Sequence, residues 1–172
     1  TGTVIFEKNA DEKREAASIT KLMTALLTLE ALEDGRVALN DSVTVSPNAA
    51  AMKGSQALLD ANAVYSLEDL LRTTIMASAN DSAVALAEYL AGTEQAFVER
   101  MNARASEIGM ADTLYVNCTG YPQSGQHTTA RDVMRLCCEV ARHPDYFRYA
   151  SVWIDKLTHP GGRVTDLTNT NR

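Results

Sequence analysis

The sequence is poor in cysteine and histidine, with only three of each among its 172 residues. The cysteines, Cys118, Cys137 and Cys138, are odd in number and form no C-x-x-C pair, which argues against a disulfide framework. Buried thiols are the simpler interpretation. The histidines lie far apart and have no short ligand spacing such as H-x-x-x-H, so we expect no metal site and no cofactor.

Two further absences concern positive charge and long apolar runs. Lysine and arginine total 16 against 22 aspartates and glutamates, which gives a formal net charge of -6. No basic cluster offers a footprint for a phosphate backbone, which argues against nucleic acid as a partner. No apolar run approaches the roughly 20 residues that span a bilayer, and the opening TGTVIFEKN lacks the layout of a signal peptide. We therefore expect either a cytoplasmic protein or a mature or trimmed chain.

What is present is the composition of an ordinary globular protein, with 45% hydrophobic and 22% charged residues. The length suits a single domain, which we place at residues 1–172. Hydrophobic spacing, caps and Gly or Pro stops predict helices at residues 18–34, 66–77, 82–92, 93–109 and 128–142. The predicted extended segments are a strand at 3–7, short pieces within 37–46, and a hairpin around Pro160-Gly161-Gly162.

The first predicted helix begins with SITKLM, residues 18–23, and this start breaks a local rule. The N-terminus of a helix is partly positive, so its first turn favours Asp or Glu over Lys. A capping box would place Glu or Gln three residues after an N-cap Ser18, but the sequence has Lys21 there. Such violations tend to lie at functional sites.

Ser18 and Lys21 form a candidate pair of nucleophile and base. Residues three apart lie on one helix face, which brings the hydroxyl and the amine within hydrogen-bond reach. An unperturbed lysine is neutral in only about one molecule in 2,500 at pH 7, so it can act as a base only where its pKa falls. An apolar interior and the positive helix end would both lower that pKa, and helix N–H groups would face the oxyanion. For S-x-x-K alone, an N-cap serine followed by a solvent-exposed lysine is the more frequent arrangement.

A second cluster, Ser78-Ala79-Asn80, lies at the predicted break between two helices. A hydroxyl and a carboxamide can face a cleft there, although a helix junction with Asn80 or Asp81 as N-cap explains the same residues. Together, S-x-x-K and S-x-N match two of the three signatures of penicillin-binding proteins and serine β-lactamases.

Beyond these motifs, the chain resembles the low-molecular-mass D-alanyl-D-alanine carboxypeptidases nearly from end to end. The similarity is carried, in order, by TGTVIFEKNADEKREAASITKLMTALL, IMASANDSAVALAEYLAG, GQHTTARDVMRL and LTNTNR. The resemblance implies an α/β fold of the α+β type. This is the β-lactamase and DD-peptidase-like transpeptidase fold, here mainly its helical body with an incomplete antiparallel sheet.

The same resemblance implies a site and a reaction. Ser18 would attack the peptide bond between the two terminal D-alanines of a peptidoglycan stem peptide, with Lys21 as the base. Ser78 would relay a proton to the leaving amine, Asn80 would bind the substrate amide, and water would clear the acyl-enzyme. β-Lactams would acylate the same Ser18. The family is exported, so the implied location is extracytoplasmic, in the bacterial cell envelope.

The third signature, K-T-G, occurs nowhere in the sequence. In the family that the chain resembles, it lies on a sheet strand shortly after N-T-N, which here is Asn169-Thr170-Asn171. A family strand that precedes TGTVIFEKN is missing as well. We therefore expect a truncated catalytic domain, whose sheet a further C-terminal segment would complete; a short relative that binds without turnover is the alternative. Without K-T-G, the sequence does not supply the second backbone N–H group that would bind the oxyanion. It also does not supply the cation that would bind the substrate carboxylate.

Three rival functions fit the same residues. A class A-like β-lactamase shares Ser18, Lys21 and the spacing to Ser78, but it needs a deacylating glutamate, and LYVNCTGYPQSGQ contains none. A non-catalytic module that binds penicillin or peptidoglycan would explain the missing K-T-G. A purely structural helical domain would tolerate Lys21→Met without any effect on binding.

Overall fold

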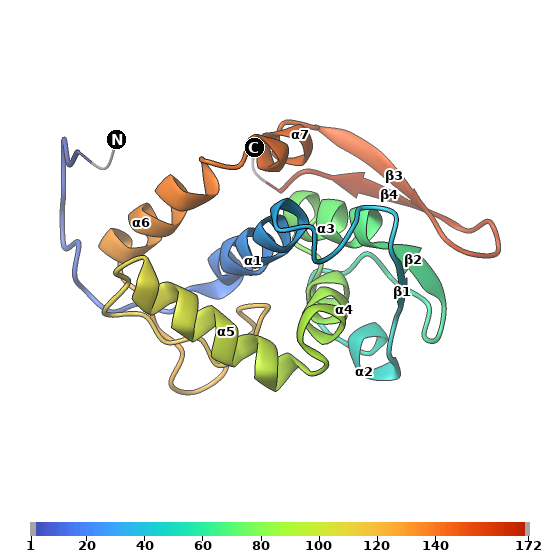
Figure 1. Cartoon of the computed structure of the whole chain (residues 1–172), viewed down its shortest axis with the longest axis horizontal. Helices are drawn as coiled ribbons and strands as arrows, with labels where there is room; N and C mark the ends of the chain where they lie inside the picture. Colours follow the sequence, from blue (N-terminus) through green and yellow to red (C-terminus); the bar gives the residue numbers. More distant parts are fainter. Residues whose placement is uncertain (1–2, 171–172) are drawn as a thin grey trace.

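The structure is a computed structural model that describes residues 3–170, in which helices surround a central helix and two small antiparallel sheets lie at the side (Figure 1). This is an arrangement of the α+β type. The elements of the described residues are, in chain order, η1 (Ala17–Thr20), α1 (Lys21–Glu33), β1 (Ser42–Thr44), α2 (Pro47–Ala50), β2 (Val64–Ser66), α3 (Leu67–Met76), α4 (Asn80–Ala91), α5 (Glu94–Glu107), α6 (Ala130–Val140), α7 (Pro144–Ala150), β3 (Ile154–Thr158) and β4 (Val164–Thr168).

Helix α1 is the centre of the fold and contacts α3, α4, α5, α6 and α7. Its apolar side chains Met23, Leu26 and Leu29 are at most 2% exposed. Burying each of them contributes roughly 1.5–3 kcal/mol to folding. The prediction that this apolar segment forms an interior helix is confirmed, and α1 can therefore hold a side chain away from water.

Helices α3 and α5 begin where their caps predict. Ser66 accepts a hydrogen bond from the Asp69 N–H over 3.0 Å at the start of α3, and Thr93 accepts one from the Ala96 N–H over 3.1 Å at the start of α5. These side chains satisfy N–H groups that the helix itself leaves free. The predicted helix at 128–142 is likewise present as α6.

Two short helices, α2 and α7, were not predicted. Each begins at a proline, Pro47 and Pro144. From the sequence alone, each proline predicts only the end of the segment before it. Proline also suits the first position of a helix, because the N–H that it lacks would be unsatisfied there.

The predicted C-terminal hairpin is confirmed as the antiparallel pair β3–β4, in register from Ile154 opposite Thr168 to Thr158 opposite Val164. Leu157 and Leu167 point into the core and are fully buried, whereas Trp153, Ile154 and Val164 are more than half exposed. The pieces predicted within 37–46 include β1, which pairs with β2. One face of the hairpin thus packs on the core, and the other is exposed and carries both apolar side chains and the Lys156–Asp166 ion pair.

The strand predicted at residues 3–7 is wrong. These residues are not in a ladder with any other part of residues 3–170, and Ile5 and Phe6 are 96% and 82% exposed. A segment of residues with high β-propensity forms a strand only when a partner strand supplies the hydrogen bonds. Instead, an ion pair of 3.0 Å between Glu7 and Arg131 of α6 ties this segment to the body.

All three cysteines are free thiols. The interpretation as buried thiols holds for Cys118, but Cys138 is half-buried and Cys137 is exposed on α6. Among residues 3–170, no three His, Cys, Asp or Glu side chains converge as metal ligands. Across the same residues, every helix is too short or too polar to traverse a bilayer.

Candidate active site

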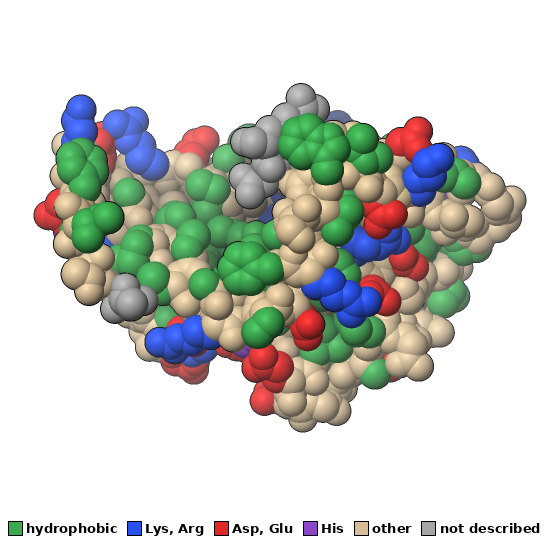
Figure 2. All heavy atoms as spheres, turned by 90° about the horizontal axis from the view of Figure 1, so that it is seen from above, with side chains coloured by type: hydrophobic (Ala, Val, Ile, Leu, Met, Phe, Trp, Pro, Cys, Tyr) green, Lys and Arg blue, Asp and Glu red, His purple; other side chains and the backbone are tan. Residues whose placement is uncertain are grey.

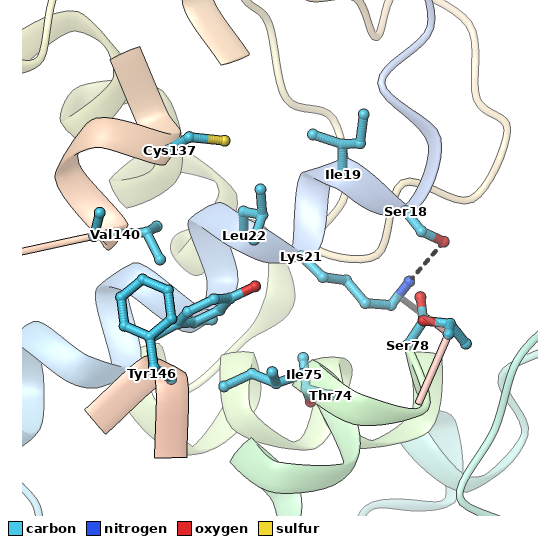
Figure 3. A pocket seen from close by; sticks show the side chains of 14 residues that line it. Ser18, Ile19, Lys21, Leu22, Thr74, Ile75, Ser78, Cys137, Val140 and Tyr146 are labelled. Atoms are coloured by element: carbon cyan, nitrogen blue, oxygen red, sulfur yellow. Dashed lines mark hydrogen bonds between the residues drawn. The ribbon is translucent and has the colours of Figure 1, made fainter. Parts of the chain in front are cut away.

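Ser18 lies in the short 3-10 turn η1 that precedes α1. The N-cap of this turn is Ala16, and the Ala17 backbone has a left-handed φ of 44°. Ser18 is therefore not the N-cap of a long helix, and that prediction is wrong. The turn makes Lys21 the first residue of α1 and directs its side chain back toward Ser18 (Figure 3). Lys21 Nζ donates to Ser18 Oγ over 3.3 Å, so hydroxyl and amine meet as their spacing predicts.

Lys21 is buried, with 4% of its surface exposed. Its Nζ also donates to the backbone carbonyl of Thr119 over 2.7 Å. Burial lowers the pKa of Lys21 from 10.5 to about 8, while the nearby Cys118 acts in the opposite direction. A pKa near 8 leaves about one amine in ten neutral at pH 7, because each pKa unit is a factor of ten. This amine can therefore accept a proton near neutral pH.

Ser78 occupies the break between α3 and α4 with a left-handed φ of 55°. A side-chain-bearing residue adopts this conformation at an energetic cost, and such strain is concentrated at functional sites. The Ser78 hydroxyl is buried and has no hydrogen-bond partner within residues 3–170. Figure 3 shows it beside the Lys21 amine at the edge of one cavity. A buried unpaired hydroxyl costs about 1–3 kcal/mol, which a reacting ligand could offset.

Asn80 is the first residue of α4, whose N-cap is Ala79 rather than Asn80 or Asp81. The Asn80 amide donates to the Lys53 carbonyl over 2.5 Å, which fixes the orientation of the carboxamide. Its carbonyl oxygen accepts no hydrogen bond from the described part of the chain. That oxygen is an acceptor available to a ligand.

Asp81 connects two segments of the chain next to Asn80. Its two carboxylate oxygens accept hydrogen bonds of 3.0 Å from the N–H groups of Ala57 and Leu59. The residue is fully buried. The carboxylate thus ties the segment around residue 57 to the start of α4, next to Asn80.

Ser18 stands between two hollows. The larger has a volume of about 560 Å³ and is mostly apolar. On the face seen in Figure 2, apolar side chains gather around this depression. The smaller hollow, of about 240 Å³, is more polar than the larger one and is lined in part by Asn80. The larger is lined by Ser18, Ile19, Lys21, Leu22, Ala25, Thr74, Ile75, Ser78, Cys137, Val140, Ala141, Tyr146, Phe147 and Thr170.

Sequence reasoning missed the loop at residues 117–123, which completes the site. Besides the Thr119 carbonyl, it brings Gly120 so close to Ser18 that a Cβ there would lie 1.7 Å from the Ala17 carbonyl oxygen. Gly120 has a φ of 78°, which favours glycine. A backbone carbonyl leaves no sequence motif, but the Asn117-x-x-Gly120 pattern of a tight turn was a usable signal.

Solved structures with this fold include a D-alanyl-D-alanine carboxypeptidase and a penicillin binding protein. The D-alanyl-D-alanine carboxypeptidase DacD from Francisella tularensis superimposes with a TM-score of 0.91 at 32% identity, covering 96% of this chain and 40% of that one. Penicillin binding protein 5 from Haemophilus influenzae gives 0.90 at 29% identity, covering 97% and 48%. The D-alanyl-D-alanine carboxypeptidase DacF of Bacillus subtilis is 36% identical over 172 residues, which are 100% of this chain and 44% of DacF.

The fold and the buried Ser18–Lys21 pair place the chain in the class of penicillin-binding proteins. The profile of the D-alanyl-D-alanine carboxypeptidase family matches residues 1–172, and the chain belongs to that family. The fold expected from the sequence is thereby confirmed. The chain spans less than half the length of these three relatives.

Proposed function

We propose that the chain carries the acylation site of a serine-type D-Ala-D-Ala carboxypeptidase that trims peptidoglycan stem peptides. The observation that carries this proposal is the buried Lys21 amine, 3.3 Å from the Ser18 hydroxyl and with a pKa lowered to about 8. A hydroxyl is a weak nucleophile unless an adjacent base removes its proton, and this amine can do so at neutral pH.

In the proposed reaction, Ser18 Oγ attacks the carbonyl carbon of the bond between two terminal D-alanines. Its proton passes to the neutral Lys21 amine, and N–H groups of the turn around Ser18 stabilise the oxyanion. The C–N bond then breaks, and the Ser78 hydroxyl relays the proton from Lys21 to the leaving amine. Free D-alanine departs and an ester remains on Ser18. Water hydrolyses that ester and regenerates the hydroxyl.

Asn80 binds the substrate on the acyl side in this scheme. Asn80 lines the smaller hollow that adjoins Ser18, and its carbonyl oxygen accepts no hydrogen bond from the described residues. A peptide N–H of the stem peptide is a suitable donor to that oxygen. Because the Lys53 carbonyl already fixes the carboxamide, little side-chain entropy is lost on binding.

β-Lactams should acylate the same serine, because their strained amide takes the place of the D-Ala-D-Ala bond. Peptidoglycan lies outside the cytoplasmic membrane, so the proposed location is the bacterial cell envelope. This part of the proposal rests on the family and on the penicillin-binding neighbours.

We propose further that residues 1–172 act as one catalytic domain and that a segment with K-T-G, absent from this sequence, completes the sheet beside the hairpin. The exposed apolar side chains Ile154 and Val164 on the hairpin, and Trp153 just before it, suit such a cover. The apolar cavity beside Ser18 would be closed by the same segment. A cation from K-T-G would bind the terminal carboxylate of the substrate.

Incubation of the full-length gene product with benzylpenicillin tests the function. We expect one penicilloyl group on the peptide that contains Ser18, and we expect this acyl-enzyme to be hydrolysed slowly. We also expect release of D-alanine from a peptide that ends in D-Ala-D-Ala. Intact-mass spectrometry and a D-alanine assay measure the two. Rapid hydrolysis of penicillin would instead indicate a β-lactamase. Binding of peptidoglycan with neither acylation nor release would indicate a non-catalytic module.

A further inference from the structure

The loop at residues 117–123 is folded around the amide of one buried side chain, Asn117. Its Oδ1 accepts from the Gly120 N–H over 2.7 Å, and from both the N–H and the hydroxyl of Thr119 over 3.2 Å. Its Nδ2 donates to the Tyr121 carbonyl over 2.9 Å and to Gln123 Oε1 over 3.2 Å. One carboxamide therefore fixes the path of the whole turn.

This turn lies against the face of α1 that carries the candidate base. Thr24 and Lys21, three residues apart on one helix face, bind successive carbonyls of the loop. Thr24 Oγ1 donates to the Cys118 carbonyl over 2.7 Å, and Lys21 Nζ donates to the Thr119 carbonyl over 2.7 Å. The hydrogen bond to the Thr119 carbonyl fixes the position of Lys21 Nζ. In that position the amine also donates to Ser18 Oγ.

We propose that Asn117 is a positioning residue for Lys21: its amide holds the Thr119 carbonyl where it orients the amine toward Ser18 and keeps water away from it. The inference rests on the proposed function only in calling Lys21 the base. Asn117 touches neither Lys21 nor Ser18 by any hydrogen bond of the described residues, so it acts through the backbone of Thr119 and Gly120.

Few titratable groups near Lys21 could shift its pKa in addition to the exclusion of water. The elements packed near it contribute the Cys118 thiol of the loop, Cys137 of α6 and Tyr146 of α7, and Glu94 of α5 lies behind Cys118. Burial raises the pKa of Cys118 and Tyr146, and partial desolvation raises that of the surface thiol of Cys137, so all three are uncharged near neutral pH. Exclusion of water therefore determines the protonation of the amine.

The titration of Lys21 tests the proposal without relying on activity. In the full-length gene product with ¹³C-labelled lysine, NMR should show a Lys21 signal that titrates near pH 8. In Asn117→Ala the turn opens, water reaches the amine, and this midpoint should rise by about one pH unit. Acylation by benzylpenicillin at pH 7 should then fall about tenfold, because the neutral fraction falls tenfold per unit. Lys21→Met assigns the signal.

Asn102 of α5 offers a matched control. Its carboxamide binds the same connection two residues before Asn117, accepting from the Tyr115 N–H over 2.9 Å and donating to the Tyr115 carbonyl over 2.8 Å. Among residues 3–170, its side chain forms no hydrogen bond with the turn that faces Lys21. Asn102→Ala should lower the stability of the protein and leave the Lys21 midpoint unchanged. A purely structural role for Asn117 predicts that the two variants behave alike.

Asn117→Ser keeps the proposal testable if the alanine variant does not fold. A serine hydroxyl forms the same kind of turn more weakly, so an intermediate rise of the midpoint is expected. An unchanged midpoint in both Asn117 variants, or an equal rise in Asn102→Ala, overturns the proposal. If the wild type is not acylated at all, the proposed function fails, and the NMR titration still decides the role of Asn117.

Discussion

Replacing Ser18 with alanine should abolish covalent labelling by fluorescent penicillin. The label forms an ester with a hydroxyl, and alanine has none. Ser18 is the hydroxyl that receives a hydrogen bond from the buried Lys21 amine. We expect the labelled band in a denaturing gel to fall below detection, while the thermal unfolding midpoint stays close to that of the wild type.

Ser106→Ala is the matched control, because Ser106 is exposed on α5, away from both hollows. This variant should be labelled as fast as the wild type. Persistent labelling of Ser18→Ala would mean that another nucleophile is acylated, and Ser78, which lines the same cavity, would be examined first by peptide mapping.

Replacing Lys21 with methionine should lower the acylation rate by about 10²–10⁴-fold, the usual contribution of a general base. Methionine fills a similar volume without a charge to desolvate. The free energy of unfolding should therefore stay unchanged or rise, since burial disfavours the ammonium of Lys21. Loss of rate together with retained or raised stability separates a catalytic role from a structural one.

The rate is measured by stopped-flow or quenched labelling at several penicillin concentrations, and stability by urea unfolding. Lys156→Met, on the exposed side of β3, controls for the removal of a positive charge from the protein. It should change neither quantity appreciably. A rate loss smaller than about tenfold in Lys21→Met would show that Lys21 is not the base.

The parts of this molecule that sequence predicted are those that depend on local spacing. An apolar segment without a polar face gave the interior helix α1, and the capping serine Ser66 gave the start of α3. The three-residue spacing brought Ser18 and Lys21 together, although through a 3-10 turn rather than a helix cap. Such features need no knowledge of distant segments.

The features that sequence missed depend on distant partners. The segment at residues 3–7 has strand-forming residues but no partner strand within residues 3–170. The Thr119 carbonyl lies 98 positions from Lys21 in sequence, and any residue carries such a carbonyl. Its position follows from Asn117 and Gly120 together, which only the folded turn reveals.

Two influences were expected to lower the Lys21 pKa, burial and the positive end of α1. In the structure, burial is the largest cause. The sequence could predict the direction of the shift because α1 is apolar throughout. The depth of burial could not be predicted, since it depends on how the loop at 117–123 closes over the amine.

The pH dependence of acylation by benzylpenicillin tests the central claim most directly, namely that a buried, neutral Lys21 activates Ser18. The neutral amine is the active form, so the second-order rate should rise about tenfold per pH unit below pH 8 and level off above it. A rate that is flat between about pH 6 and 9, or that keeps rising toward the ordinary lysine pKa of 10.5, would contradict the account.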